Sequence, residues 1–174
     1  PETIKNEEDI SDLIRVLKDY ENYHKVMIYP NSDNMSQVII KKIEEYGNTN
    51  PSNVTVLKSV ERLTYLSLVK HCDILVGNSS SGIIEAPSLG CAVVNIGDRQ
   101  KGRIRSKANI DVEMDYDKLK RAFKLALSEP FKIILSRTQN PYDQGYPSKT
   151  ILKWLCDSQD ETKSKKFFNL EFEI

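Results

Sequence analysis

The stretch "DILVGNSSSGIIEAPSLGCAVVNIG", Asp73 to Gly97, decides the fold of this chain. Its two ends are short apolar runs, which are typical of strands buried on both faces of a parallel sheet. Between them, a polar cluster and a second apolar segment predict a turn followed by a helix. Pro87 removes a backbone donor, so we expect this helix to be short or kinked. Strand, helix and strand in this order form the repeating unit of an α/β protein.

The same alternation continues outward on both sides of this stretch. Apolar residues at helical spacing predict further helices near residues 10–20, 38–46, 65–69 and 119–127, and in "SKTILKWL". The last of these would be capped by Ser148. Further apolar runs predict strands at "KVMIYP", "NVTVLK" and "NIDV". The sequence therefore predicts a Rossmann-like parallel sheet with helices on both faces, in which ligands bind at the carboxyl ends of the strands.

Size and composition exclude several classes of protein. At 174 residues, the chain is long enough for one domain with a core. Lys plus Arg number 25, as do Asp plus Glu, so the charge gives no reason to expect nucleic acid or a membrane as a partner. No apolar run approaches the roughly 20 residues that span a bilayer, and the N-terminus lacks the layout of a signal peptide.

The three cysteines have no metal-ligand spacing, which indicates reduced thiols and a cytoplasmic setting. We expect Cys72 and Cys91 to be small core residues. His24 and His71 have no neighbours that would form a triad, so we expect them on the surface. The sequence thus predicts no metal, no cofactor and no general acid–base pair.

The polar cluster of residues 77–82, here called the serine turn, is the first candidate site. The first N–H groups of a helix lack internal partners and carry the positive end of its dipole, and small side chains let a phosphate approach them. An ordinary helix cap explains one serine. A run of serines before a glycine exceeds that need, so we expect a phosphate site formed by Ser79, Ser80, Ser81 and Gly82.

A carboxylate and a basic loop follow the serine turn. Glu85 could accept both hydroxyls of a ribose, or it could merely complement the helix dipole. Cations in "GDRQKGR", the loop after the next strand, would neutralise a diphosphate. Arg99 and Arg103 are the candidates, whereas we expect Lys101 and Arg105 to be solvated.

The segments "PNSD", "VGNSSSGIIEAPSLG" and "VVNIGDRQKGR", in this order and spacing, resemble the UDP-N-acetylglucosamine 2-epimerase family. They are most similar to its hydrolysing branch, which makes N-acetylmannosamine for sialic acid or related nonulosonic acid synthesis. The non-hydrolysing branch usually carries "DSGG.QEEAP" at the turn. The resemblance extends from Pro1 to about Trp154. We expect a UDP-binding domain at residues 1–156 and leave the tail, residues 157–174, unassigned.

The resemblance implies the C-terminal half of a two-domain, GT-B-type enzyme with its active site in the cleft between the domains. The acid–base carboxylates of the family lie on the N-terminal domain, so no catalytic residue is expected in this chain. The opening "PETIKNEED" resembles the segment after a functional histidine in "HPET". The chain starts with Pro1 and with a helix, so we expect a fragment that begins just past that histidine and the strand before it.

The resemblance also implies roles for single residues. Ser79 and Ser80 would hold the diphosphate, Glu85 the ribose hydroxyls, and Arg99 would face the phosphates. Asn31 would lie at the nucleotide and Val60 near the uracil. The family often continues "PN.DAGS" where this chain has "PNSDNMS", which leaves the role of Asp33 open.

The resulting hypothesis is the UDP-binding domain of a hydrolysing UDP-N-acetylglucosamine 2-epimerase. The intact enzyme would convert UDP-N-acetylglucosamine and water to N-acetylmannosamine and UDP by elimination and then hydration, and the fragment alone would be inactive. The alternatives are the nucleotide-binding domain of a GT-B glycosyltransferase and a non-catalytic nucleotide-sugar binding module. Expected partners are a UDP-sugar and the missing N-terminal domain. A homo-oligomer is possible, and a diacetylated bacillosamine-type sugar remains an alternative substrate.

Overall fold

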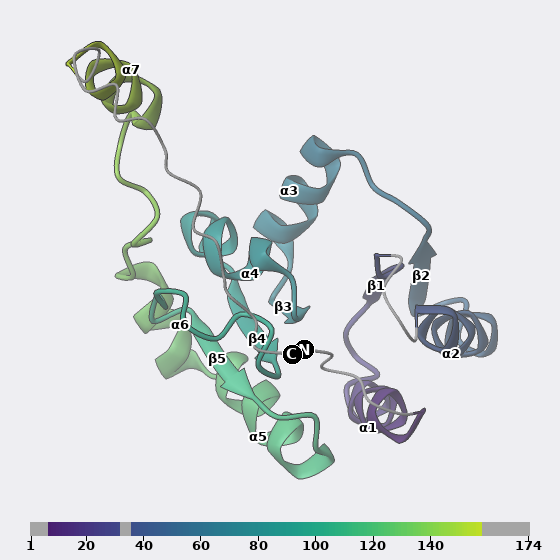
Figure 1. Cartoon of the computed structure of the whole chain (residues 1–174). Helices are drawn as coiled ribbons and strands as arrows, with labels where there is room; N and C mark the ends of the chain where they lie inside the picture. Colours follow the sequence, from purple (N-terminus) through teal and green to yellow (C-terminus); the bar gives the residue numbers. More distant parts are fainter. Residues whose placement is uncertain (1–6, 32–35, 158–174) are drawn as a thin grey trace, which may run out of the picture. The chain divides into compact units, whose positions relative to one another are not determined.

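The computed structural model describes residues 7–31 and 36–157. The chain divides into two units, residues 1–143 and 144–174, and each is described by itself. The second unit contains one described helix, α7 (Pro147–Asp157). The first unit contains, in order, α1 (Glu7–Lys18), β1 (Lys25–Ile28), α2 (Ser36–Thr49), β2 (Val54–Leu57), α3 (Arg62–His71), β3 (Ile74–Gly77), α4 (Ser80–Ile84), the 3-10 helix η1 (Ala86–Leu89), β4 (Ala92–Ile96), β5 (Asn109–Val112), α5 (Tyr116–Ala126) and α6 (Glu129–Ser136) (Figure 1).

The strands form two parallel sheets rather than the single sheet that the sequence suggests. β1 pairs with β2 in one sheet, and β3, β4 and β5 form the other with β4 in the middle. The register aligns the last residue of β3, Gly77, with Asn95 near the end of β4. The loops that follow β3 and β4 therefore leave the sheet at the same edge. The expected α/β class with parallel strands is confirmed.

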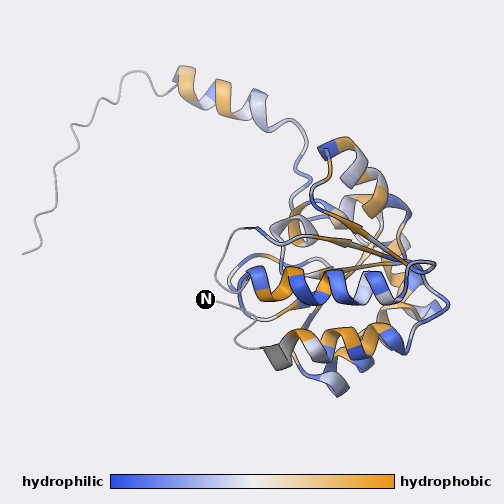
Figure 2. Ribbon diagram, turned by 90° about the vertical axis from the view of Figure 1, so that its right-hand side faces the viewer, coloured by the Kyte–Doolittle hydropathy of each residue, from blue (hydrophilic) through white to orange (hydrophobic). Residues whose placement is uncertain are grey.

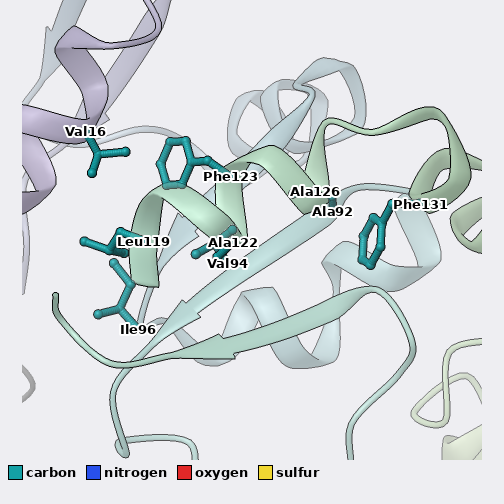
Figure 3. Packing of buried hydrophobic residues seen from close by; sticks show 9 residues of the cluster. All are labelled: Val16, Ala92, Val94, Ile96, Leu119, Ala122, Phe123, Ala126 and Phe131. Carbon is teal, nitrogen blue, oxygen red and sulfur yellow. The ribbon is translucent and has the colours of Figure 1, made fainter. Parts of the chain in front are cut away.

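β4 is buried along its whole length because helices cover both faces of its sheet. Alternate side chains of a strand point to opposite faces. Ala92, Val94 and Ile96 pack in one hydrophobic cluster with residues of α1, α5 and α6 (Figure 3). Cys91 and Val93 pack on the other face with residues of α3 and η1. This packing accounts for the continuous apolar run in the sequence.

Helix α1 connects the helices of the two sheets. It packs against α2, which contacts β2, and also against α5, which contacts β4 and β5. After α1, the ring of Tyr20 lies 5.3 Å from the ring of Phe123 in α5. Asp19 accepts hydrogen bonds from Tyr116 and from the ammonium group of Lys120. The hydrogen bond from Lys120 is the main reason why the pKa of Asp19 lies below its usual value.

Several local predictions can be compared with these elements. The segment at residues 80–89 is short and broken, as Pro87 predicts: α4 ends at Ile84 and a 3-10 helix follows. The cap assigned to Ser148 is wrong, because α7 already begins at Pro147. The sequence analysis missed α6, although Ser128 accepts a hydrogen bond from Phe131 N as its N-cap.

The hydropathy of the chain follows the same architecture. In Figure 2, hydrophobic colour runs along the strands, whereas the helices carry hydrophilic and hydrophobic residues side by side. None of the described helices is long and apolar enough to cross a membrane.

The thiols of Cys72 and Cys91 lie 3.4 Å apart at the amino ends of β3 and β4. Cys91 is buried and Cys72 is half-buried, so the expectation of core cysteines holds fully for Cys91. The hydrogen bond between the thiols stabilises negative charge on Cys72, which lowers the pKa of Cys72 and raises that of Cys91.

The packing on β4 predicts the effect of shortening two leucines of α5. Leu119 is fully buried, whereas Leu125 is 49% exposed. Leu119→Ala should lower the free energy of unfolding by about 2–5 kcal/mol, because it leaves a cavity beside β4. Leu125→Ala, the matched control, should change it by no more than about 0.5 kcal/mol. Urea denaturation followed by circular dichroism measures both, and equal losses would contradict this account of the core.

Candidate functional site

The serine turn begins where β3 ends. Gly77 has φ of +148°, a backbone conformation that side chains disfavour, and this lets the chain leave the sheet sharply. Ser79 is the N-cap of α4, and its hydroxyl oxygen accepts a hydrogen bond from Ser81 N at 3.3 Å. The ordinary cap that the sequence offered as an alternative is therefore present. It uses one of the three serines.

The hydroxyl groups of the turn are linked in a chain. Ser81 Oγ donates to Ser79 Oγ at 3.0 Å and lies 2.5 Å from the phenol oxygen of Tyr65 in α3. Because the proton of Ser81 is directed at Ser79, Tyr65 must be the donor to Ser81. Burial raises the pKa of Tyr65, which keeps this donor protonated. Ser79 accepts twice, and within the described residues its own proton meets no acceptor, which leaves it to donate to a ligand.

The two remaining candidates in the turn, Ser80 and Gly82, lie in different environments. Ser80 is half-buried, and its hydroxyl makes no hydrogen bond within the part of the chain that the structure describes. Gly82 is buried, and a methyl group there would lie 2.9 Å from Cγ1 of Val93. Asn109 Nδ2 donates to the carbonyl of Gly82 at 2.9 Å. Close packing against β4 is thus sufficient to explain Gly82.

Glu85 lies at the C-cap of α4 rather than in its first turns. Glu85 is also the N-cap of η1, where its side chain makes no cap hydrogen bond, so the structure leaves both interpretations of this carboxylate in place. Its Oε1 instead accepts a hydrogen bond from the guanidinium of Arg62 at 2.7 Å. The side chain of Arg62 is 76% exposed, and ion pairs this accessible contribute about 0–1 kcal/mol. Ligand hydroxyls could therefore replace Arg62 at small cost.

The basic loop, residues 97–105, follows β4. Arg99 and Arg103 are both exposed, and so is Lys101, for which the sequence predicts a solvated side chain. Gln100, which the sequence analysis did not single out, is buried and donates from Nε2 to the carbonyl of Asn78 at 2.8 Å. This hydrogen bond joins the basic loop to the serine turn.

Arg105 corrects one expectation. It is not a solvated loop cation, because its Nε contacts both carboxylate oxygens of Asp111 in β5, at 3.0 and 3.2 Å. Asp111 also accepts a hydrogen bond from the buried side chain of Asn95 in β4. Arg105 therefore helps to hold the end of the basic loop on the sheet.

The remaining candidates lie in loops after the strands of the other sheet. Asn31 follows β1 and is exposed, and Val60 follows β2 and is half-buried. Neither has a side-chain hydrogen bond or ion pair within the described ranges. Arg62, two residues after Val60, supplies the link from this loop to Glu85. Asp33, Asn34 and Met35 lie outside the described residues.

A pocket of about 320 Å³ adjoins Glu85. It is lined by both charged partners of the ion pair and by the apolar or aromatic side chains of Leu66, Leu89 and Tyr142. None of the three serines lines it. Among the described residues, no group of His, Cys, Asp or Glu side chains could hold a metal ion.

The parallel strands, with polar loops gathered at their carboxyl ends, define an α/β protein of the Rossmann-like class. The family profile described as UDP-N-acetylglucosamine 2-epimerase matches residues 1–156. The chain belongs to this family.

Sequence similarity to two bacterial proteins supports this membership. The chain is 34% identical over 169 residues to the "Polysialic acid biosynthesis protein P7" of Escherichia coli, a match that covers 95% of this chain and 42% of the relative. It is 38% identical over 134 residues to the "UDP-N,N'-diacetylbacillosamine 2-epimerase (hydrolyzing)" of Legionella pneumophila, covering 77% of this chain and 34% of the relative. The chain thus spans less than half the length of either.

A solved structure gives the same fold. The UDP-GlcNAc 2-epimerase of Methanocaldococcus jannaschii, in complex with UDP-GlcNAc and UDP, matches with a TM-score of 0.66 and 19% identity. The match covers 89% of this chain and 42% of that protein.

The hydroxyl chain predicts a stabilising role for Tyr65. Tyr65→Phe removes the donor to Ser81 and should lower the free energy of unfolding by about 0.5–1.5 kcal/mol. Tyr146→Phe is the control, because Tyr146 is 74% exposed and should change stability by less than about 0.5 kcal/mol. Urea denaturation of the two variants makes the comparison. An unchanged midpoint for Tyr65→Phe would argue against a hydrogen-bonded turn.

Proposed function

We propose that this chain is the UDP-binding C-terminal domain of a hydrolysing UDP-N-acetylglucosamine 2-epimerase. The intact enzyme would release UDP from UDP-N-acetylglucosamine, or from a related diacetylated sugar, and hydrate the resulting glycal. Family membership favours this reading over a GT-B glycosyltransferase. A domain of this kind would have two partners, a UDP-sugar and the N-terminal domain that the longer relatives' length implies.

The observation that carries the proposal is the hydrogen bond from Gln100 to the carbonyl of Asn78. It brings the basic loop next to the serine turn, so hydroxyl donors and arginines stand at the same edge of the sheet. A diphosphate needs both kinds of group, because hydroxyls orient its oxygens and arginines balance its charge.

The turn offers two hydroxyl donors. Within the described residues, the Ser79 hydroxyl donates to no acceptor, and it already accepts hydrogen bonds from the Ser81 hydroxyl and the Ser81 backbone. Hydrogen bonds in a chain polarise one another, so the chain that starts at Tyr65 makes Ser79 a stronger donor. Ser80 adds a second hydroxyl, and Arg99 and Arg103 would supply the charge.

Glu85 is the residue proposed to bind the ribose. One of its oxygens is held by Arg62, and a carboxylate provides about four acceptor sites in total. It can therefore accept a ribose hydroxyl beside Arg62 or in place of it. Val60 and Asn31 would lie at the base and the rest of the nucleotide, as the family resemblance implies.

The proposal predicts weak UDP binding that depends on two separable groups. Ser80→Ala should weaken both UDP and inorganic pyrophosphate by about 10- to 100-fold, the loss expected for one hydrogen bond to a charged group. Arg99→Ala should likewise weaken both ligands. Glu85→Ala should weaken UDP and leave pyrophosphate nearly unchanged, because pyrophosphate has no ribose. Isothermal titration calorimetry at high protein concentration provides the affinities.

Two exposed positions serve as matched controls. Ser136→Ala on α6 and Glu45→Ala on α2 should leave both affinities unaltered. If wild-type chain and the Ser80 and Arg99 variants bound UDP equally, the serine turn would not be the phosphate site. Equal losses of both ligands in Glu85→Ala would indicate general damage to α4 instead of a lost ribose contact.

The proposal also predicts that the chain by itself does not turn over UDP-N-acetylglucosamine. General acid–base groups contribute about 10²–10⁴-fold, and the family places them on the other domain. Release of UDP and N-acetylmannosamine by this chain should stay at background. The Legionella relative, assayed at full length in parallel with UDP-N-acetylglucosamine and its diacetylated counterpart, provides the positive control. A rate within about tenfold of that enzyme would mean that catalytic groups lie within these residues.

A further inference from the structure

Gln100 is buried in the middle of an exposed loop. Its side chain is 4% exposed, whereas its neighbours Arg99 and Lys101 are exposed. Two glycines of the same loop, Gly97 and Gly102, have φ of +73° and +83°. The backbone therefore bends on both sides of Gln100, and the bends direct this side chain inward while its neighbours face outward.

The side chain reaches from one strand end to the next. Nε2 donates to the carbonyl of Asn78 at 2.8 Å, and Asn78 immediately precedes the N-cap Ser79. The paired ends of β3 and β4 bring the two loops close, but the sheet ends before either loop begins. This hydrogen bond is therefore a tie between the loops that the strand pairing does not supply.

The other end of the same amide is unpaired. Gln100 Oε1 is buried and has no hydrogen-bond partner among the described residues. A buried acceptor without a partner costs at least as much free energy as one hydrogen bond gains. The amide as a whole thus contributes little net stability, and leucine, which has neither the donor nor the orphan acceptor, should be tolerated at this position.

We infer that Gln100 is a positioning residue that holds the basic loop against the serine turn, so that Arg99 and the serine hydroxyls meet the same diphosphate. This inference rests on the proposed function. Without the tie, the loop samples more conformations, and ligand binding must order it at a cost in affinity. Gln100 itself donates to the protein backbone and acts on the ligand through the arginines of the basic loop, Arg99 among them.

The test combines single and double variants in pyrophosphate and UDP titrations. Gln100→Leu should weaken both ligands by about three- to tenfold and shift the melting temperature by less than about 2 °C. In the Arg99→Ala background, Gln100→Leu should have a clearly smaller further effect on affinity, because part of its action passes through that arginine. Gln139→Leu, at an exposed position, is the control and should alter neither affinity nor melting temperature.

If the losses of binding free energy caused by Gln100→Leu and Arg99→Ala simply added in the double variant, the inference would be overturned, since Gln100 would then act independently of Arg99. A large drop in melting temperature for Gln100→Leu would also overturn it, because the residue would then be a stability determinant.

A second readout needs no ligand. Gln100→Leu should speed amide hydrogen exchange in residues 78–81 and 98–103 by about threefold or more, while α5 stays unchanged. Unaltered exchange in both loops would refute the tie. If wild-type chain binds neither ligand, the proposed function fails, and the exchange measurement still decides whether Gln100 joins the loops.

Discussion

Burial of β4 on both faces is the constraint on which the rest of the structure depends. Ala92, Val94 and Ile96 pack with residues of α1, α5 and α6 on one face, and Val93 packs with residues of α3 and η1 on the other. Parallel pairing with β3 then sets where the two neighbouring loops emerge. The polar groups of the site thus stand on a rigid support whose interior is almost wholly apolar, with Asn95 as a buried exception paired to Asp111.

The class of fold could be predicted because each apolar run is short and uninterrupted, and because helical periodicity separates the runs. The division into two sheets could not, since it depends on which strand edges meet. Within the site, the serine turn and the exposed arginines were recognisable as residue types in a pattern. Gln100, Tyr65 and Arg62 were not, because their importance comes from partners distant in the sequence, namely Asn78, Ser81 and Glu85. Arg105 was misjudged for the same reason, since its partner Asp111 lies on the next strand.

The site combines two kinds of polar group. In the chain of hydroxyls, Tyr65 donates to Ser81 and Ser81 donates to Ser79, which limits the conformations of the turn. In the pair formed by Arg62 and Glu85, Arg62 is mostly exposed to solvent and can be replaced, whereas the side chain of Glu85 is only 26% exposed. This combination suits a ligand with two different ends. The hydroxyl donors would orient a charged end, and a neutral end with hydroxyl groups would compete with Arg62 for the carboxylate of Glu85.

The separation of the sheets has a consequence for the behaviour of this chain in solution. Within the described residues, β1 and β3 each pair along one side only, and their open sides carry backbone N–H and C=O groups of apolar segments. Val26 in β1 is 42% exposed, and β3 is less buried than β4 along its whole length. Unpaired apolar strand edges recruit strands from other molecules. Handled by itself, this polypeptide is therefore expected to self-associate as its concentration rises, through the backbone of its edge strands.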